Sequence, residues 1–301
     1  MKRMGAETRQ GRRARESRRW YLLFIPLFVV VGFVEIYPLI ESLYISLTNL
    51  NGGASLSNYV TMVTTPTFWN ALNISLLYSL SSTILAVLIG IGLTFILTQE
   101  LKGKGIFEAI YILPLAAAPI VVGVLYSPSS VWDDIQQFFH FILHQPYFNE
   151  LTPSFYFPVM FFSDAWEWSP LIMLVALSIV NSASKEVYEA AELHGASALQ
   201  KFRMVTLPAV FRSPVMQFVV VLRFIDAMRA FEVPLAWTNW LGYTNTLGSP
   251  VDTISLYLYK LLYSSSLGFP LGVVSAVAVS LFVVTLVGAL VLLRLMKAVG
   301  G

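Results

Sequence analysis

The stretch EVYEAAELHGASALQKFRMVTLP, residues 186–208, is the longest polar segment in the second half of an otherwise apolar chain. Its first residues favour a helix that begins near residue 184, and Gly195 can end that helix because glycine adopts a left-handed conformation at no steric cost. Ser197 and Gln200 have the spacing of a capping box, which predicts a second helix that Pro208 closes. We expect a compact amphipathic helix pair between two membrane-spanning segments, and such a pair is suited to docking.

The same segment resembles the EAA loop of permease subunits in ABC importers, which reads EAA, three residues, GA, five residues, F, and then V or I before LP. His194 departs from the pattern, since aspartate usually stands there. In the family this loop is a coupling helix in a groove of the cytoplasmic ATPase subunit; the alternative is an ordinary surface helix between spans. The matching residues are Glu189, Ala190, Ala191, Gly195, Ala196, Phe202, Val205, Leu207 and Pro208.

Composition indicates a membrane protein. Of the 301 residues, 56% are hydrophobic and 12% are charged, whereas soluble domains carry about a quarter charged residues. Six apolar segments approach the length of about twenty residues that a bilayer requires, and Pro114 and Pro119 predict a kink in the third. We expect an all-α polytopic membrane protein with about six transmembrane helices. The segments are expected near residues 21–47, 70–97, 106–126, 155–180, 211–234 and 270–295.

The basic residues predict the orientation in the membrane. Of the 19 lysines and arginines, Lys260 is the one expected in an outside loop, and Arg223 and Arg229 fall within the fifth span. The rest lie on the side of the N-terminus, which the positive-inside rule makes cytoplasmic. A basic cytoplasmic tail at residues 1–19 then touches anionic lipid rather than nucleic acid, and the permease domain follows at 20–297, with the EAA loop at 184–208 in the cytoplasm.

The resemblance covers most of the chain and points to the sugar branch of these importers, such as the maltose and glycerol-phosphate permeases. Residues 26–49, 101–123 and 163–177 resemble the first, third and fourth spans of that group. Glu108 departs from it, because arginine is common there, and residues 248–250 only weakly match its glycine-glycine-proline element.

The resemblance implies a MetI-like permease architecture in the cell membrane and several partners. These are a related second permease subunit, two ATPase subunits that hold ATP and magnesium, an extracellular substrate-binding protein and a sugar. The chain lacks a G-x-x-x-x-G-K-[ST] motif, so we expect no nucleotide site and no cofactor in it. A membrane enzyme is a further alternative, but no nucleophile–base pair or metal cluster supports it, and we expect no enzymatic activity. An ion-gradient-driven secondary transporter is the alternative; the particular sugar, and whether this subunit holds a substrate site, stay open.

Ionisable residues in the spans are candidates for the transport pathway, since such groups are costly in lipid unless they are paired or face water. Arg223, Asp226 and Arg229 recur every third residue, so they share one helix face and can pair. Together with Trp166 and Glu167 they are our pathway candidates, and a structural ion network is the alternative.

The outside loops carry weaker signals. Residues 129–144 predict an interfacial helix, and His140 and His144 have the spacing of a two-histidine metal site without a third ligand, so no metal site is expected. Aromatic and amide residues at 235–267, including Trp237, fit a membrane-surface belt or a sugar-binding loop, and we favour the belt.

Single cysteines in this cysteine-free chain test the orientation. An impermeant maleimide added to intact cells should label a cysteine at position 245 and leave one at position 195 unlabelled, because the first is expected outside and the second in the cytoplasm. Labelling at 195, or none at 245, would overturn the orientation.

Overall fold

The computed structural model describes residues 24–49, 51–99, 102–127, 131–143, 153–182, 185–244, 246–263 and 269–300. Among them, three helices can cross a bilayer by length and composition, and three bent helix pairs raise the candidate spans to six. The expected all-α architecture is confirmed. In chain order the helical elements are η1 (Gly32–Ile36), α2 (Tyr37–Ser46), α3 (Ser57–Thr64), α4 (Pro66–Leu97), α5 (Lys104–Ile112), η2 (Leu113–Ala116), α6 (Pro119–Leu125), α7 (Val131–Leu143), α8 (Pro153–Ser182), α9 (Lys185–Leu193), α10 (Ala198–Lys201), η3 (Phe202–Thr206), α11 (Leu207–Arg212), α12 (Pro214–Met228), α13 (Glu232–Trp240), α14 (Ile254–Tyr263) and α15 (Leu271–Gly300).

The chain divides into two compact units, and the smaller comprises residues 1–62 and 270–279. It contains the first candidate span, in which the π-helical turn η1 precedes α2. The amide of Asn58 donates to the carbonyls of Ser46 and Thr48 at 3.1 and 2.9 Å. These bonds satisfy carbonyl groups that the end of a helix leaves without a partner.

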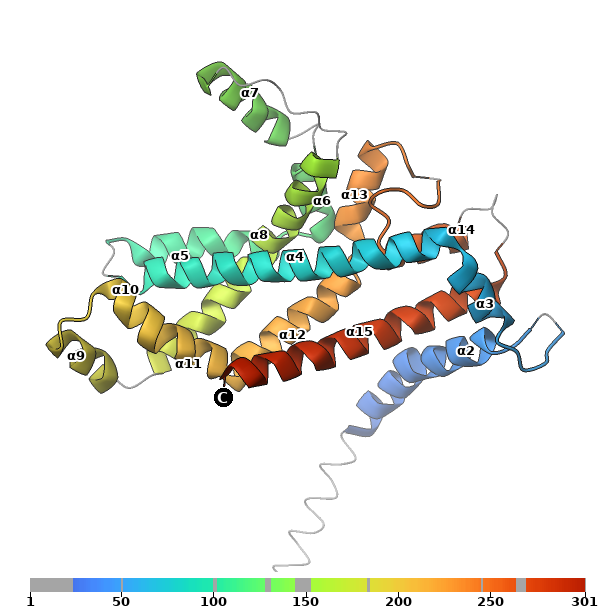
Figure 1. Cartoon of the computed structure of the whole chain (residues 1–301), viewed down its shortest axis with the longest axis horizontal. Helices are drawn as coiled ribbons and strands as arrows, with labels where there is room; N and C mark the ends of the chain where they lie inside the picture. The colour runs from blue at the N-terminus through green and yellow to red at the C-terminus, as the bar shows by residue number, and fades with distance from the viewer. Residues whose placement is uncertain are drawn as a thin grey trace, which may run out of the picture. The chain divides into compact units, whose positions relative to one another are not determined.

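The larger unit, residues 63–269 and 280–301, is organised around α4, which packs along α8 and beside α12 (Figure 1). Ser79 and Ser82 of α4 are fully buried, and a Cβ atom at Gly90 would lie 2.7 Å from the Ile172 side chain of α8. Small residues therefore allow close packing of α4 on α8. Gly92, in contrast, faces open space.

Two of the three bent pairs correspond to the third and fifth expected spans. The third bends by 101° before α6, which confirms the predicted kink. The fifth, expected to run unbroken over residues 211–234, bends by 69° before α12 and breaks again at residues 229–231. Pro234 explains the second break, since it has no N–H for the carbonyl of Ala230 four residues earlier. That carbonyl instead accepts a hydrogen bond from the Thr253 hydroxyl at 2.7 Å.

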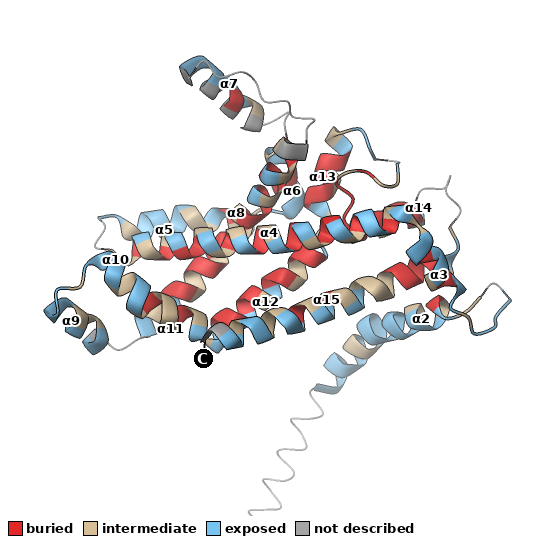
Figure 2. Ribbon diagram, in the orientation of Figure 1, coloured by how far each residue is buried: buried red, intermediate tan, exposed pale blue. Residues whose placement is uncertain are grey.

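The region 235–267, expected to be an outer loop, includes the end of α13 and all of α14. Trp237 on α13 is fully buried and clusters with Tyr78 and Met160, and Figure 2 shows the buried positions along this helix. The assignment of Trp237 to an aromatic belt is therefore wrong, because its ring fills the core between α4, α8 and α13.

The packing of α4 on α8 predicts different costs for two glycine substitutions. Gly90→Val should destabilise the purified protein by about 1–3 kcal/mol, because the new side chain overlaps Ile172 and the Ser169 carbonyl. Gly92→Val is the matched control, since nothing lies within 4 Å of its Cβ position. Thermal unfolding in detergent measures both, and equal melting temperatures for the two variants would contradict the packing.

Candidate functional site

A fully buried arginine joins three helices of the larger unit. The guanidinium of Arg223 on α12 donates through Nη2 to the carboxylate of Asp164 on α8 and, at 3.0 Å, to the Ser82 hydroxyl on α4. Its Nη1 donates to Oδ2 of Asp226 at 3.2 Å. The Trp168 ring lies over the guanidinium, with its centroid 5.0 Å from Cζ. The charge is thus paired and hydrogen-bonded, the conditions under which a protein can bury it.

A polar cavity of about 390 Å³ lies beside this cluster, and the helix break at residues 229–231 lines one side of it. Glu167 is 5% exposed, and among the residues that the structure describes its Oε2 has no hydrogen-bond partner. Arg229 is more exposed and lies 3.8 Å from Asp226. The cavity therefore offers charged groups and an unsatisfied acceptor to whatever enters it.

The predicted pathway residues divide between this cavity and its surroundings. Glu167, Asp226 and Arg229 line it, and Arg223 lies behind it as the anchor of the cluster. The pairing expected for Arg223, Asp226 and Arg229 is present. Whether these residues line a transport pathway stays a prediction.

Trp166 does not line the cavity; its ring packs against Tyr126, with the centroids 5.5 Å apart. Trp168 does line the cavity, although it was not among the pathway candidates. Helical spacing could have identified it, since Asp164, Glu167 and Trp168 stand at positions i, i+3 and i+4 on one face of α8.

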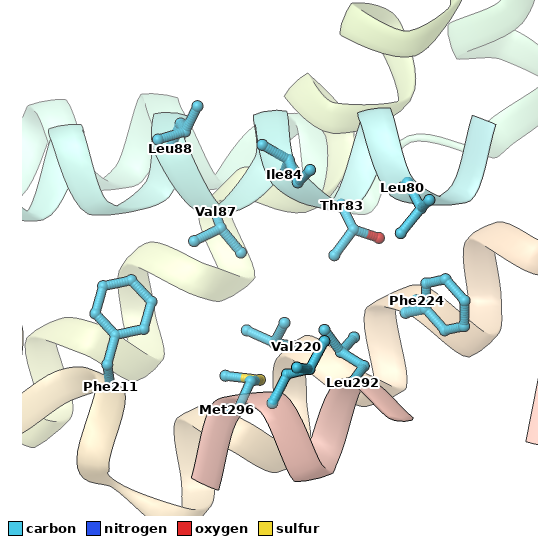
Figure 3. A pocket seen from close by; sticks show the side chains of 11 residues that line it. Leu80, Thr83, Ile84, Val87, Leu88, Phe211, Val220, Phe224, Leu292 and Met296 are labelled. Atoms are coloured by element: carbon cyan, nitrogen blue, oxygen red, sulfur yellow. The ribbon is translucent and has the colours of Figure 1, made fainter. Parts of the chain in front are cut away.

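A second pocket, of about 340 Å³, lies between α4, α11, α12 and the last part of α15 (Figure 3). Leu88, Phe211, Phe224 and Leu292 line it, and the hydroxyl of Thr83 is a rare polar group on its wall. The polar cavity offers several hydrogen-bonding groups and this one hardly any, so the polar cavity is the better candidate site for a polar ligand.

The polar segment forms the helix pair that its sequence predicts. Gly195 has φ +75°, and the capping box is formed, with Gln200 Oε1 accepting from the Ser197 N–H at 2.8 Å and Ser197 Oγ accepting from the Gln200 N–H at 3.3 Å. An ion pair between Lys201 and Glu192 ties α10 to α9. The predicted helix stop and restart are confirmed.

Pro208, however, does not close this segment. The helix continues through the π-helical turn η3 into α11, with the Leu207 N–H bonded to the Phe202 carbonyl five residues earlier. A proline in a regular α-helix clashes with the carbonyl four residues before it, and the wider turn relieves this clash.

One face of the helix pair is anchored and the other is open. The Phe202 ring lies 4.8 Å from that of Phe95 on α4, while Leu193, Leu199 and Met204 are 90%, 62% and 75% exposed. Of the predicted coupling residues, the exposed ones are Glu189, Ala190 and Gly195, and the partly buried ones are Ala191, Ala196, Phe202 and Pro208.

Lys260, counted as an exposed outer charge, is buried. Its Nζ donates to Asp252 at 2.6 Å and to the carbonyls of Tyr243 and Thr246 at 2.9 and 3.0 Å. Burial raises the pKa of the Asp252 carboxyl, and the hydrogen bond and charge of Lys260 oppose this shift. The pair holds Tyr243, Thr246 and Asp252 against α14.

A helix, α7, is present where an interfacial helix was predicted, with His140 exposed; its place at the membrane surface stays a prediction. His144 lies outside the described residues. Among those that the structure describes, no group of three side chains could hold a metal ion.

No family model matches the chain, but curated proteins do. It is 28% identical to the trehalose/maltose transport system permease protein MalF of Thermococcus litoralis, over 93% of this chain and 94% of that protein. It is 29% identical to the arabinooligosaccharides transport system permease protein AraP of Bacillus subtilis, over 91% of this chain and 87% of that protein. It is 26% identical to the trehalose transport system permease protein SugA of Mycobacterium tuberculosis, over 97% of this chain and 92% of that protein.

A solved structure shares the fold. It is a bacterial ABC transporter involved in the import of the acidic polysaccharide alginate, with a TM-score of 0.78, 20% identity, and coverage of 97% of this chain and 100% of that one. The chain is a multi-pass membrane protein with the fold of an ABC importer permease. Over nearly its whole length it resembles sugar-type permeases, as the motifs predict.

The cluster predicts opposite results for two arginines that share Asp226. Arg223→Met should destabilise the protein by about 3–5 kcal/mol, because it leaves the buried Asp164 carboxylate unpaired. Arg229→Met should change stability by less than about 0.5 kcal/mol, since this side chain is 66% exposed. Thermal unfolding and detergent-extracted yield compare them, and equal losses would show that Arg223 does not anchor the fold.

Proposed function

We propose that this chain is a transmembrane permease subunit of an ABC importer that carries a sugar across the cell membrane and couples to ATP hydrolysis by partner subunits. The observation that carries the proposal is the helix pair at residues 186–208, which combines the EAA pattern with an open apolar face. The similarity to permeases of trehalose, maltose and arabinooligosaccharide transport systems supports a sugar as the cargo.

A continuous path of packed residues supports the coupling role. The Tyr188 hydroxyl of α9 lies 3.2 Å from the Thr206 hydroxyl of η3, and Phe202 rests on α4. From η3 the chain runs through α11 directly into α12, which carries Arg223 and Asp226. A displacement of α9 by an ATPase subunit would therefore move the helix that forms part of the polar cavity.

The chemistry of the cavity supports sugar passage. Carboxylates such as Asp226 accept hydrogen bonds from sugar hydroxyls, and the Trp168 ring offers a flat apolar face.

The partners we propose are a related second permease subunit, two cytoplasmic ATPase subunits with ATP and magnesium, and an extracellular substrate-binding protein. Both termini and the helix pair would be cytoplasmic. A secondary transporter is not favoured, because it leaves the EAA segment unexplained.

Two substitutions in the helix pair test the coupling role. Glu189→Ala should weaken binding of the ATPase subunit at least about tenfold, because a charge-assisted hydrogen bond contributes about 1.5–3 kcal/mol. Gly195→Val should be as damaging, because valine resists the φ of +75° although its Cβ has open space.

Asp134→Ala, which removes an exposed carboxylate on α7, is the control. Copurification with the ATPase and ATP hydrolysis by the complex are the measurements. Normal association and hydrolysis in both test variants would refute the docking assignment.

A further inference from the structure

The polar cavity contains more acidic than basic groups. Carboxylates of Asp164, Glu167, Asp226 and Glu232 line it, and Arg229 is the basic side chain among the described lining residues. Arg223 lies behind the wall, with its guanidinium bonded to Asp164, Asp226 and Ser82. Even with Arg223 included, four carboxylates face two guanidinium groups.

Among the described residues, Glu167 is the buried carboxyl of the cavity lining that neither arginine pairs. Its side chain lines the cavity although the residue is only 5% exposed. Its Oε2 has no hydrogen-bond partner among the described residues. Neither arginine forms an ion pair with it within the described structure. A buried acceptor without a partner favours a ligand that supplies a hydroxyl or ammonium donor.

We propose that this cavity selects by charge, so that it admits neutral or cationic carbohydrates and repels anionic ones such as uronates and sugar phosphates. A cleft lined by one sign of charge changes the local concentration of ions by about 10- to 1,000-fold. The inference rests on the proposed function, because it concerns the cargo of that site.

The fold alone does not decide this selectivity. The fold is shared with a transporter involved in the import of an acidic polysaccharide, at 20% identity. The side chains that line the cavity, rather than the arrangement of helices, would therefore set the charge of the cargo.

Charged thiol reagents test the cavity without knowledge of the sugar. In the assembled complex in membrane vesicles, Ala230→Cys places a single thiol of this chain on the cavity wall, and Thr244→Cys places one at an exposed outer site. Each is treated with a cationic trimethylammonium methanethiosulfonate and an anionic sulfonate methanethiosulfonate. The ratio of cationic to anionic rates should be at least about tenfold higher at position 230 than at position 244.

Glu167→Gln should lower that ratio several-fold in the Ala230→Cys background, whereas Asp134→Asn, outside the cavity lining, should not change it. Equal ratios at 230 and 244, a faster anionic reagent at 230, or no reaction with either reagent would overturn the inference.

Sugar uptake separates this result from the proposed function. If the rate ratio is high but the complex imports no sugar with ATP, the proposed function fails while the charge of the cavity stands. If the complex imports glucuronate-containing oligosaccharides as fast as neutral ones, the charge selection fails while the importer function stands.

Discussion

The buried guanidinium of Arg223 constrains the larger unit more than any other group. Taking it out of water is costly, and the cost is offset only if its partners on three helices stay in place. Asp164 fixes α8, Ser82 fixes α4 and Asp226 fixes the position one turn along α12. Moving α12 along its axis would break the contacts with Asp164 on α8 and Ser82 on α4 at once, so the cluster defines one register for the three helices.

The cluster that stabilises the fold also forms part of the wall of the polar cavity. Asp226 shares its carboxylate between the buried Arg223 and the exposed Arg229, so one residue belongs both to the anchor and to the cavity wall. The helix break caused by Pro234 opens the wall at this level, and the Ala230 carbonyl that it frees is satisfied by Thr253. The broken span therefore exposes polar side chains to the cavity without leaving this carbonyl unpaired.

The sequence predicted the features that depend on local chemistry. Apolar length identified the spans, Gly195 and the Ser197 capping box set the helix pair, and prolines predicted the kink in the third span. Each of these features depends on residues close together in the sequence, so it could be predicted without knowledge of the fold.

Features that depend on distant partners could not be predicted in this way. The burial of Lys260 could not be predicted, because its counterion and carbonyl partners come together only in the fold. Trp237 fits a membrane-surface belt by composition, and only the packing of α13 on α4 and α8 buries it. Pro208 was expected to end a helix, and the π-helical turn that accommodates it leaves no clear mark in the sequence.

The central claim is that ATP hydrolysis by partner subunits moves a sugar through a pathway that this chain helps to form. Uptake of a panel of radiolabelled sugars into proteoliposomes, with ATP supplied on the side of the ATPase subunits, tests it most directly. We predict uptake that requires ATP, stops with vanadate and continues after a protonophore has abolished the proton gradient. Uptake that proceeds without ATP under an imposed ion gradient would contradict the account.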